Sequence, residues 1–265
     1  MDIHGTAVVH PSAMIEEGAR IGAGVRIGPF SLIGAQVVLH KGVEVKSHAV
    51  VTGLTEVGAD SVIFPFATVG EVPQDLKYRG EKTRLIVGAR CRIREGATLN
   101  TGTAGGGGLT QVGDDCLLMT GAHVGHDAKL GHRVVLANQV AIAGHCQIGD
   151  DVIIGGLSGI HQWVRVGNGA IIGALTMVTN DVIPHGLVQA ARGELEGLNL
   201  VGLKRRGVER AEIAALRAAY EMLRDGEGAF LDRARRLSET ATSPMVCEMV
   251  GFILSASDRS FLTPK

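Results

Sequence analysis

The chain has 265 residues and a formal net charge of −1, which argues against a nucleic-acid-binding surface or a polybasic membrane anchor. Hydrophobic residues make up 45% of the chain and aromatic residues only 3%, so the core must be built from Val, Ile, Leu and Ala. The four cysteines lack metal-binding spacing and indicate reduced thiols of a cytoplasmic protein. The N-terminus shows no signal peptide, and no apolar run approaches the roughly 18 residues of a membrane span.

An aliphatic residue recurs at every sixth position from Ile3 to Val69, and again from Val112 to Val178. A six-residue period fits neither an α-helix nor an alternating strand, and it is typical of a parallel β-helix. Three hexads would form one triangular coil, and successive coils would stack at strand spacing, about 4.8 Å. About 27 clear hexads predict a prism of about nine coils.

Two interruptions of the hexads predict outward loops. The first, near residues 71–84, leaves the register intact, because the hexads resume in phase at Val87. The second, residues 101–111, contains four consecutive glycines and shifts the phase by one before Val112. Loops on a rigid scaffold often carry function. The role of the glycine-rich loop stays open at this point.

The hexads end near Pro184, and the segment from His185 to Gly202 is expected to be irregular. Helical periodicity follows in three stretches, 213–223, 230–237 and 246–254, with Ser243 as an N-cap before Pro244. We therefore predict a β-helix domain over residues 1–190 and a helical domain over residues 191–265. The helical domain is expected to cover the last coil of the prism.

Five of the ten histidines lie between His123 and His161. With three hexads in a coil, His126 would lie in one column with Gly144 and Gln162, and His145 and His161 would fall next to that column. Histidine is the side chain whose ordinary pKa suits general base catalysis near neutral pH. This edge of the prism is therefore the expected active site.

Three segments resemble one family within the left-handed β-helix acyltransferases. They are GEVPQDLKYRGE (70–81), AHVGHD (122–127) and GLKRRG (202–207), which follows Asn199. Together with the hexads they resemble the UDP-N-acetylglucosamine O-acyltransferases over essentially the whole chain. The resemblance implies a cytoplasmic homotrimer with active sites between adjacent prisms. It also implies transfer of an (R)-3-hydroxyacyl group from acyl carrier protein to the 3-OH of UDP-N-acetylglucosamine, the first step of lipid A biosynthesis, without a cofactor or metal.

The resemblance also implies roles for particular residues. His126 matches the catalytic base and Asp127 the carboxylate that orients it, which requires corner geometry because strand neighbours normally point to opposite faces. A backbone N–H near Gly144 is the candidate oxyanion donor. Asn138 is expected to face inward, in a column of small residues with Ala174, as part of an acyl-chain groove. The other expected substrate-binding residues are Gln74, Asp75, Lys77, His123, His145, His161, Gln162, Asn199, Arg205 and Arg206.

The chain departs from the family pattern at Asn100 and Thr101, where a His-Arg pair is common, and at Val201, where an acidic residue is common. Four alternatives remain open. They are the related hexapeptide N-acyltransferase, an acceptor with a 3-amino sugar, a zinc enzyme similar to γ-type carbonic anhydrase, and a structural β-helix without catalysis. The preferred acyl length is left undecided.

Overall fold

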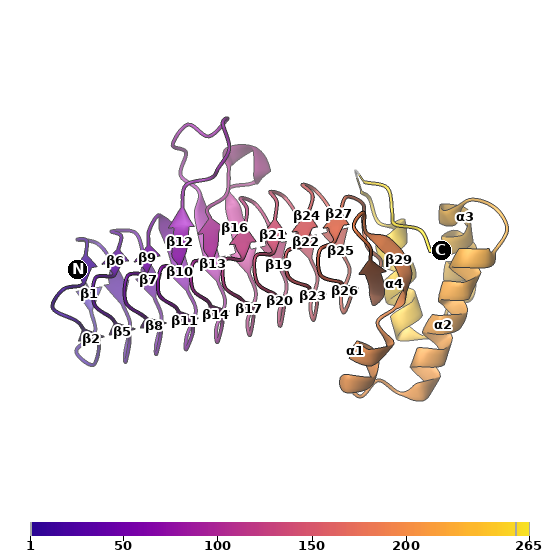
Figure 1. Ribbon diagram of the computed structural model, residues 1–265, viewed down its shortest axis with the longest axis horizontal. Coiled ribbons are helices and arrows are strands. Elements are labelled where there is room, and N and C mark those ends of the chain that lie inside the picture. The colour runs from indigo at the N-terminus through magenta and orange to yellow at the C-terminus, as the bar shows by residue number, and fades with distance from the viewer. Residues whose placement is uncertain (1, 258, 265) are drawn as a thin grey trace.

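The computed structural model describes residues 2–257 and 259–264. Its first 27 strands form nine triangular coils, each with one strand in each of three sheets, stacked along one axis as a parallel β-helix (Figure 1). Lys129 pairs with Gln111 and with Gln147, each three hexads away along the chain, which confirms the expected coil length. The prediction of about nine coils is confirmed.

Sheet A has nine strands, and the residues that point outward from it are mostly polar. The strands of sheet A are β1 (Asp2–Ile3), β4 (Arg20–Ile21), β7 (Val38–Leu39), β10 (Leu54–Val57), β13 (Arg84–Val87), β16 (Leu109–Val112), β19 (Lys129–Leu130), β22 (Gln147–Ile148) and β25 (Arg165–Val166).

Sheet B also has nine coil strands, and a terminal hairpin extends it. Its members are β2 (Val8–Val9), β5 (Arg26–Ile27), β8 (Glu44–Val45), β11 (Val62–Ile63), β14 (Arg92–Ile93), β17 (Leu117–Leu118), β20 (Val135–Leu136), β23 (Ile153–Ile154), β26 (Ile171–Ile172), β28 (Gly186–Gln189) and β29 (Glu194–Leu198).

Sheet C carries the histidine-rich face. Its strands are β3 (Met14–Ile15), β6 (Leu32–Ile33), β9 (Val50–Val51), β12 (Thr68–Glu71), β15 (Thr98–Asn100), β18 (His123–Val124), β21 (Ala141–Ile142), β24 (Gly159–Ile160) and β27 (Met177–Val178). Each edge of the prism joins two sheets. Along one coil the chain passes the A–B edge, then the B–C edge and then the C–A edge.

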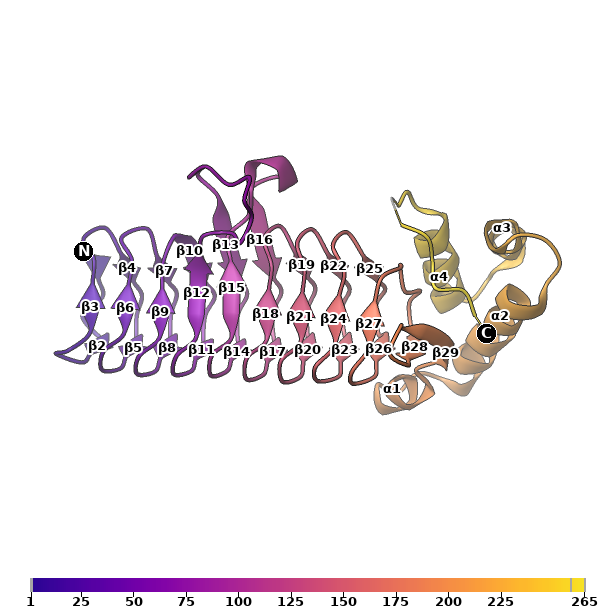
Figure 2. The ribbon, with the colours of Figure 1, turned by 45° about the horizontal axis from the view of Figure 1, so that its top comes forward.

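The two predicted loops both leave the prism between sheets C and A (Figure 2). Leu54 pairs with Arg84, and Arg84 pairs with Leu109, so both pairings span more of the chain than three hexads. The coil with the first loop is longer by two whole hexads, which explains the unbroken phase. The coil with the second loop is longer by one hexad plus a single extra residue, which explains the phase shift.

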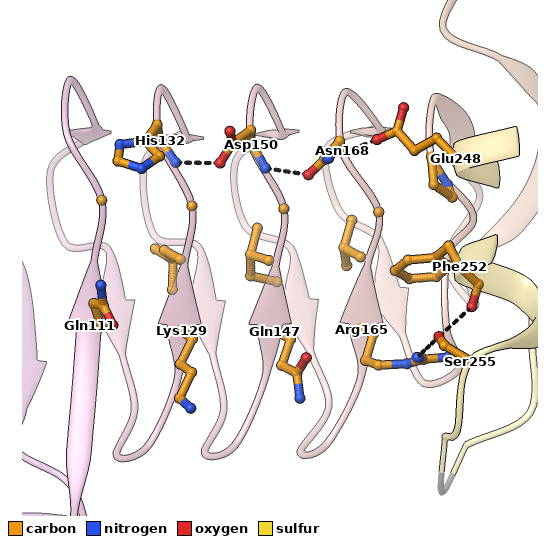
Figure 3. A pocket seen from close by; sticks show the side chains of 18 residues that line it. Gln111, Lys129, His132, Gln147, Asp150, Arg165, Asn168, Glu248, Phe252 and Ser255 are labelled. Atoms are coloured by element: carbon orange, nitrogen blue, oxygen red, sulfur yellow. Dashed lines mark hydrogen bonds between the residues drawn. The ribbon is translucent and has the colours of Figure 1, made fainter. Parts of the chain in front are cut away.

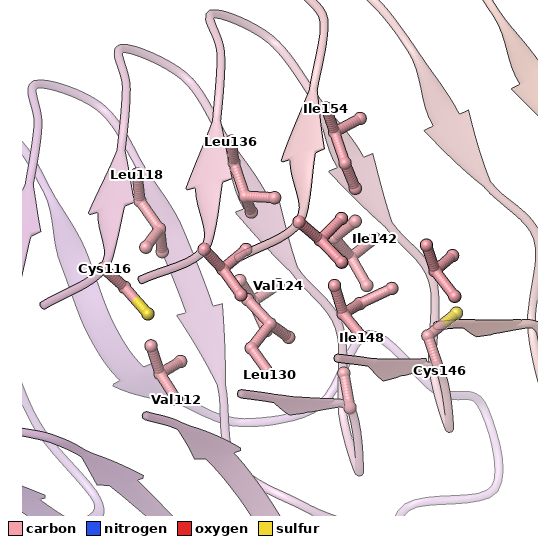
Figure 4. Close-up of a cluster of buried hydrophobic side chains, with 14 of the residues drawn as sticks. Val112, Cys116, Leu118, Val124, Leu130, Leu136, Ile142, Cys146, Ile148 and Ile154 are labelled. Carbon is pink, nitrogen blue, oxygen red and sulfur yellow. The ribbon is translucent and has the colours of Figure 1, made fainter. Parts of the chain in front are cut away.

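The core is a narrow column of aliphatic side chains, one from each hexad, with a second small or branched residue beside it (Figure 4). Cys91, Cys116 and Cys146 occupy the second kind of position and are buried. Burial raises the pKa of Cys146 to about 12, so its thiol stays protonated inside the prism. Cys91, Cys116 and Cys146 are thus buried free thiols, whereas Cys247 is free and exposed.

The C-terminal region contains a β-hairpin and four helices, α1 (Leu200–Arg205), α2 (Arg210–Asp225), α3 (Phe230–Thr240) and α4 (Pro244–Leu254). The expectation of an irregular segment from His185 to Gly202 was wrong, because β28 and β29 pair there and α1 begins at Leu200. Ser243 caps α4 by accepting a hydrogen bond from the Val246 N–H, as predicted. No described helix is both long and apolar enough to cross a bilayer.

The helices lie at the C-terminal end of the prism, beyond β27 (Figure 1). A buried ion pair fastens the chain end there, since Arg165 Nε donates to Asp181 Oδ2 at 2.7 Å and Arg165 Nη1 donates to Ser255 Oγ at 2.8 Å. The proposed domain boundary at residue 190 lies in the turn between β28 and β29. We keep that division as a proposal, while β29 extends sheet B to Leu198.

Candidate active site

The C–A edge brings together the corners that carry the predicted catalytic residues. His126 and Asp127 lie between β18 and β19, and Gly144 and His145 lie one coil further on, between β21 and β22. Gln162 follows in the next corner. Both outward loops leave the same edge, in the two coils before His126. One edge of the prism therefore holds the histidines and the loops together.

His126 and Asp127 form a buried hydrogen-bonded pair. The distance from His126 Nδ1 to Asp127 Oδ2 is 2.9 Å, and the two residues are 7% and 4% exposed. Asp127 has a φ of 59°, in the left-handed region. This corner conformation turns the two neighbouring side chains toward each other, which an extended strand does not allow. In the neutral tautomer that donates from Nδ1 to this carboxylate, Nε2 carries no proton and is free to accept one.

His145 extends the pair into a row of rings. Its ring meets that of His126 edge to face, with centroids 4.9 Å apart, and stacks on Trp163 at 3.8 Å and 5°. Its Nδ1 lies 3.8 Å from Asp127 Oδ2, too far for a hydrogen bond. Burial lowers the pKa of His145. The sequence reasoning missed Trp163, although it is the only tryptophan and follows Gln162 in the same corner.

Gly144 lies directly over the imidazole of His126. A Cβ built on Gly144 would stand 2.5 Å from His126 Cε1 and 2.6 Å from Nε2, so a side chain would displace the ring. The Gly144 N–H makes no hydrogen bond with any other described residue. On the A–B edge, the corresponding N–H of His132 donates to Asp150 at 2.8 Å. An unpaired backbone N–H beside an imidazole is suited to donate to an oxyanion.

A cleft of about 410 Å³ opens on the outer face of sheet C beside His126. Three of the strand residues that line it, Ala141, Gly159 and Met177, are small or apolar. Burial lowers the pKa of His123, whose Nδ1 is 2.8 Å from Thr98 Oγ1. The cleft thus offers an apolar floor with polar groups at one end. The predicted site residues that line it are Gln74, His123, His126, Gly144, His161 and Gln162.

Asp75 and Lys77 lie in a different hollow, of about 240 Å³, on the other side of His145. This hollow is enclosed by the first loop, Thr103 and Trp163. Asp75 Oδ1 accepts a hydrogen bond from the Lys77 N–H at 2.9 Å, so the carboxylate also shapes its own loop. The predicted site residues of the first loop are therefore divided between the two hollows. Asp75 and Lys77 line the smaller hollow, and Gln74 lines the cleft beside His126.

His161 has a partner from the chain end that the sequence reasoning missed. Arg259 Nη2 lies 2.9 Å from His161 Nδ1. The Gln162 carbonyl oxygen is also near this nitrogen, at 3.2 Å. Arginine can only donate, so the shorter bond requires an unprotonated Nδ1, and the proton then sits on Nε2.

Asn199, Arg205 and Arg206 lie away from His126 in the single chain. Asn199 caps α1 and donates from Nδ2 to the Gly169 carbonyl at 2.9 Å. Arg206 Nη2 is 3.4 Å from Nδ1 of His185. These contacts anchor the segment at the end of the prism.

Asn138 and Ala174 lie on the B–C edge, at the far side of sheet C from His126. The expectation that Asn138 faces inward was wrong, since its side chain is exposed. Asn138 is the first residue of its turn, where side chains point out of the prism. The inward-facing residue of this corner is Val140, two positions later, which is buried. Neither residue is among those that line the cleft beside His126.

The departures at Asn100 and Thr101 tie the two loops together. Asn100 Nδ2 donates to the Val72 carbonyl at 2.9 Å, and the Thr83 hydroxyl donates to Thr101 Oγ1 at 3.0 Å. Both residues are buried. They hold the base of the first loop against the second. Val201 is exposed on α1.

A larger hollow, of about 610 Å³, lies on sheet A between the prism and α4 (Figure 3). A ladder of side chains follows its rim, where Asp150 accepts from the His132 N–H at 2.8 Å and Asn168 accepts from the Asp150 N–H at 2.7 Å. Asn168 Nδ2 then donates to Glu248 at 2.7 Å. These groups are paired with one another, and the ladder joins α4 to the coils.

Among the described residues, His126, Asp127 and His145 are the group with metal-ligand atoms close together. Asp127 Oδ2 already accepts hydrogen bonds from His126 and from the Thr103 hydroxyl. With its lone pairs engaged in this way, the arrangement fits a proton-transfer pair better than a zinc site.

Comparisons with known proteins identify the relatives of this chain. Residues 181–262 match the family described as "Udp N-acetylglucosamine O-acyltransferase; Domain 2". Residues 18–53, 109–144 and 145–180 match the bacterial transferase hexapeptide family. The chain is 63% identical over 203 residues, 77% of each chain, to the acyl-[acyl-carrier-protein]–UDP-N-acetylglucosamine O-acyltransferase of Paracoccus denitrificans. It is 47% identical over 237 residues, 89% of this chain and 87% of the relative, to the same-named protein of Rhizobium johnstonii.

Solved structures give the same result for the fold. The UDP-N-acetylglucosamine acyltransferase from Campylobacter jejuni superposes with a TM-score of 0.92 at 36% identity, covering 97% of this chain and 100% of that one. The left-handed parallel β-helix with a helical C-terminal region is thereby confirmed. The chain is an acyltransferase that belongs to the UDP-N-acetylglucosamine O-acyltransferase family.

Proposed function

We propose that this chain transfers an (R)-3-hydroxyacyl group from acyl carrier protein to the 3-OH of UDP-N-acetylglucosamine, the first step of lipid A biosynthesis. The names of its relatives support the donor and the acceptor. The observation that carries the mechanism is the buried pair of His126 and Asp127, 2.9 Å apart, at the end of an apolar cleft. As the resemblance implies, the reaction takes place in the cytoplasm.

In this mechanism, His126 Nε2 takes the proton from the sugar 3-OH while that oxygen attacks the thioester carbonyl carbon. Asp127 stabilises the imidazolium that forms and keeps the Nδ1 proton in place. The Gly144 N–H donates to the developing oxyanion. The C–S bond then breaks, and the departing thiolate takes the proton from His126, so that an ester and a free thiol result.

The remaining residues would bind the substrates. His123, His161, Gln162 and Gln74 line the cleft beside the base, and Asp75 and Lys77 lie across His145. The nucleotide is expected at Asn199, Arg205 and Arg206, since guanidinium groups pair well with phosphate oxygens. Because that segment is distant from His126 within one chain, the nucleotide site requires a second subunit.

Exposed apolar residues support the homotrimer that the resemblance implies. Phe30, Phe66, Leu157 and Leu175 occupy one row of corners on the B–C edge and are between 64% and 67% exposed. A row of this kind marks an interface. If this edge of one prism covers the cleft of the next, Asn138 and Ala174 would reach the acyl chain from the neighbouring subunit.

The test is the mass of the product formed from UDP-N-acetylglucosamine and 3-hydroxyacyl carrier proteins of graded chain length. We expect one acylated nucleotide sugar from the native enzyme and nearly none from His126→Ala. His132→Ala is the matched control, because His132 lies at the next corner, on the A–B edge.

Two results would contradict the proposal. Near-normal turnover by His126→Ala would remove His126 as the base. Product from the 3-amino sugar alone, as an alkali-stable amide, would replace the acceptor while keeping the acyltransfer chemistry.

A further inference from the structure

The carboxylate of Asp127 is covered by the glycine-rich loop and held by one residue of it, Thr103. The Thr103 N–H donates to Oδ1 at 2.9 Å and to Oδ2 at 3.0 Å, and its hydroxyl donates to Oδ2 at 2.6 Å. The Asp127 side chain has no exposed surface. A hydroxyl bound to an ionised carboxylate at this distance is a strong, charge-assisted hydrogen bond.

The glycines allow the loop to approach this closely. A short 3-10 helix, η1 (Ala104–Gly106), begins directly after Thr103. A Cβ on Gly106 would stand 2.1 Å from Asp127 Cγ and 2.2 Å from Oδ2. The backbone of the loop therefore lies against the carboxylate and excludes water from it. This gives the glycine-rich loop a role that the sequence alone left open.

The position of the Asp127 carboxylate determines which histidine it hydrogen-bonds. Oδ2 is 2.9 Å from His126 Nδ1 and 3.8 Å from His145 Nδ1. A small rotation of the Asp127 side chain would exchange these partners. The two donors of Thr103 oppose that rotation, because they fix both oxygens of the carboxylate. The Thr110 hydroxyl oxygen holds the backbone of the same corner, accepting from the Asp127 N–H at 2.7 Å.

We propose that Thr103 is a positioning residue, which aims Asp127 at His126 rather than at His145, and that the loop 101–108 shields this pair from water. The inference rests on the proposed role of His126 as the base. Thr103 touches neither the sugar nor the thioester in this scheme. Its effect on the reaction passes entirely through Asp127.

The test is Thr103→Val, which removes the hydroxyl and keeps the backbone donor and the side-chain shape. We expect kcat to fall about 10-fold or more, because the pair loses its alignment, while both KM values stay near normal. With one donor fewer, Asp127 holds the shared proton more tightly. The acid limb of the pH–rate profile should therefore move to higher pH, and Thr103→Ser should restore both properties.

The matched control is Thr101→Val, which removes a buried hydroxyl of the same loop that bonds Thr83 instead of Asp127. Equal losses in both variants, or an unshifted pH profile in Thr103→Val, would overturn the inference. If the Val variant does not fold, Thr103→Ala removes the same hydroxyl with less bulk. An inactive His126→Ala beside an unchanged Thr103→Val would refute this inference and leave the proposed function standing.

Discussion

Gly144→Ala tests the position of the His126 ring, the proposed base, without disturbing the fold. The new Cβ would stand 2.5 Å from His126 Cε1, whereas carbon atoms ordinarily meet at about 3.5–4.0 Å. The ring must therefore move by about 1 Å, and it has little freedom, because Asp127 binds one side and His145 packs against it. Gly144 is not among the residues with positive φ, so alanine brings no backbone strain.

A displacement of about 1 Å in a catalytic group can cost about 100-fold in rate, and overpacking typically destabilises by about 1–3 kcal/mol. We expect Gly144→Ala to lose about that factor in kcat and to remain folded. The control is Gly5→Ala, at the equivalent position of a corner in the first coil, where a Cβ would meet nothing within 4 Å.

The assay compares initial rates of acylated nucleotide-sugar formation, and thermal unfolding of each variant reports on the fold. Wild-type rates in Gly144→Ala would refute the reasoning, since they would mean that the ring position does not matter. A parallel loss in Gly5→Ala would also refute it, because the cause would then be the corner backbone and not His126.

Three further predictions concern stability and assembly. Arg165→Ala should cost about 3–5 kcal/mol in the free energy of unfolding by urea, because it leaves the buried Asp181 carboxylate without its positively charged partner. Burial lowers the pKa of His123 and of His145 in the folded chain. The free energy of unfolding should therefore fall as the pH decreases below about 7, through the unfolded-state pKa of about 6.5. In a His123→Gln variant, the free energy measured by urea unfolding should depend less on pH. Leu157→Glu should turn trimers into monomers in sedimentation velocity, and an intact trimer would contradict the proposed interface.

The repeat could be predicted because each hexad contributes one buried aliphatic residue, and a fixed period needs no knowledge of distant contacts. The same arithmetic predicted the unbroken register after the first loop and the shift before Val112. The hairpin β28–β29 and the short helix α1 could not be found in this way. They follow no six-residue period, and α1 has too few turns to show an apolar stripe.

The column of His126, Gly144 and Gln162 was also predicted correctly, since stacked coils place residues three hexads apart in register. Thr103 was missed because its bond to Asp127 joins a loop of irregular conformation to a corner 24 residues away. Asn138 was misplaced because the hexad period tells which residues share a column and leaves their direction at a corner undetermined. Arg259 reaches His161 only through the fold of the chain end.

Both outward loops leave the C–A edge in consecutive coils, and the sheets on either side keep their strand pairing. One loop lengthens its coil by a whole number of hexads and the other does not, yet the strands of sheet A pair in both coils. Loop length at this edge is thus independent of the core sequence. The aliphatic column contains no residue of 72–83 or 101–108, whereas Gln74, Asp75 and Thr103 of these segments line the two hollows at this edge. Exchanging the two segments would therefore change the surroundings of His126 while every aliphatic residue of the column stays the same.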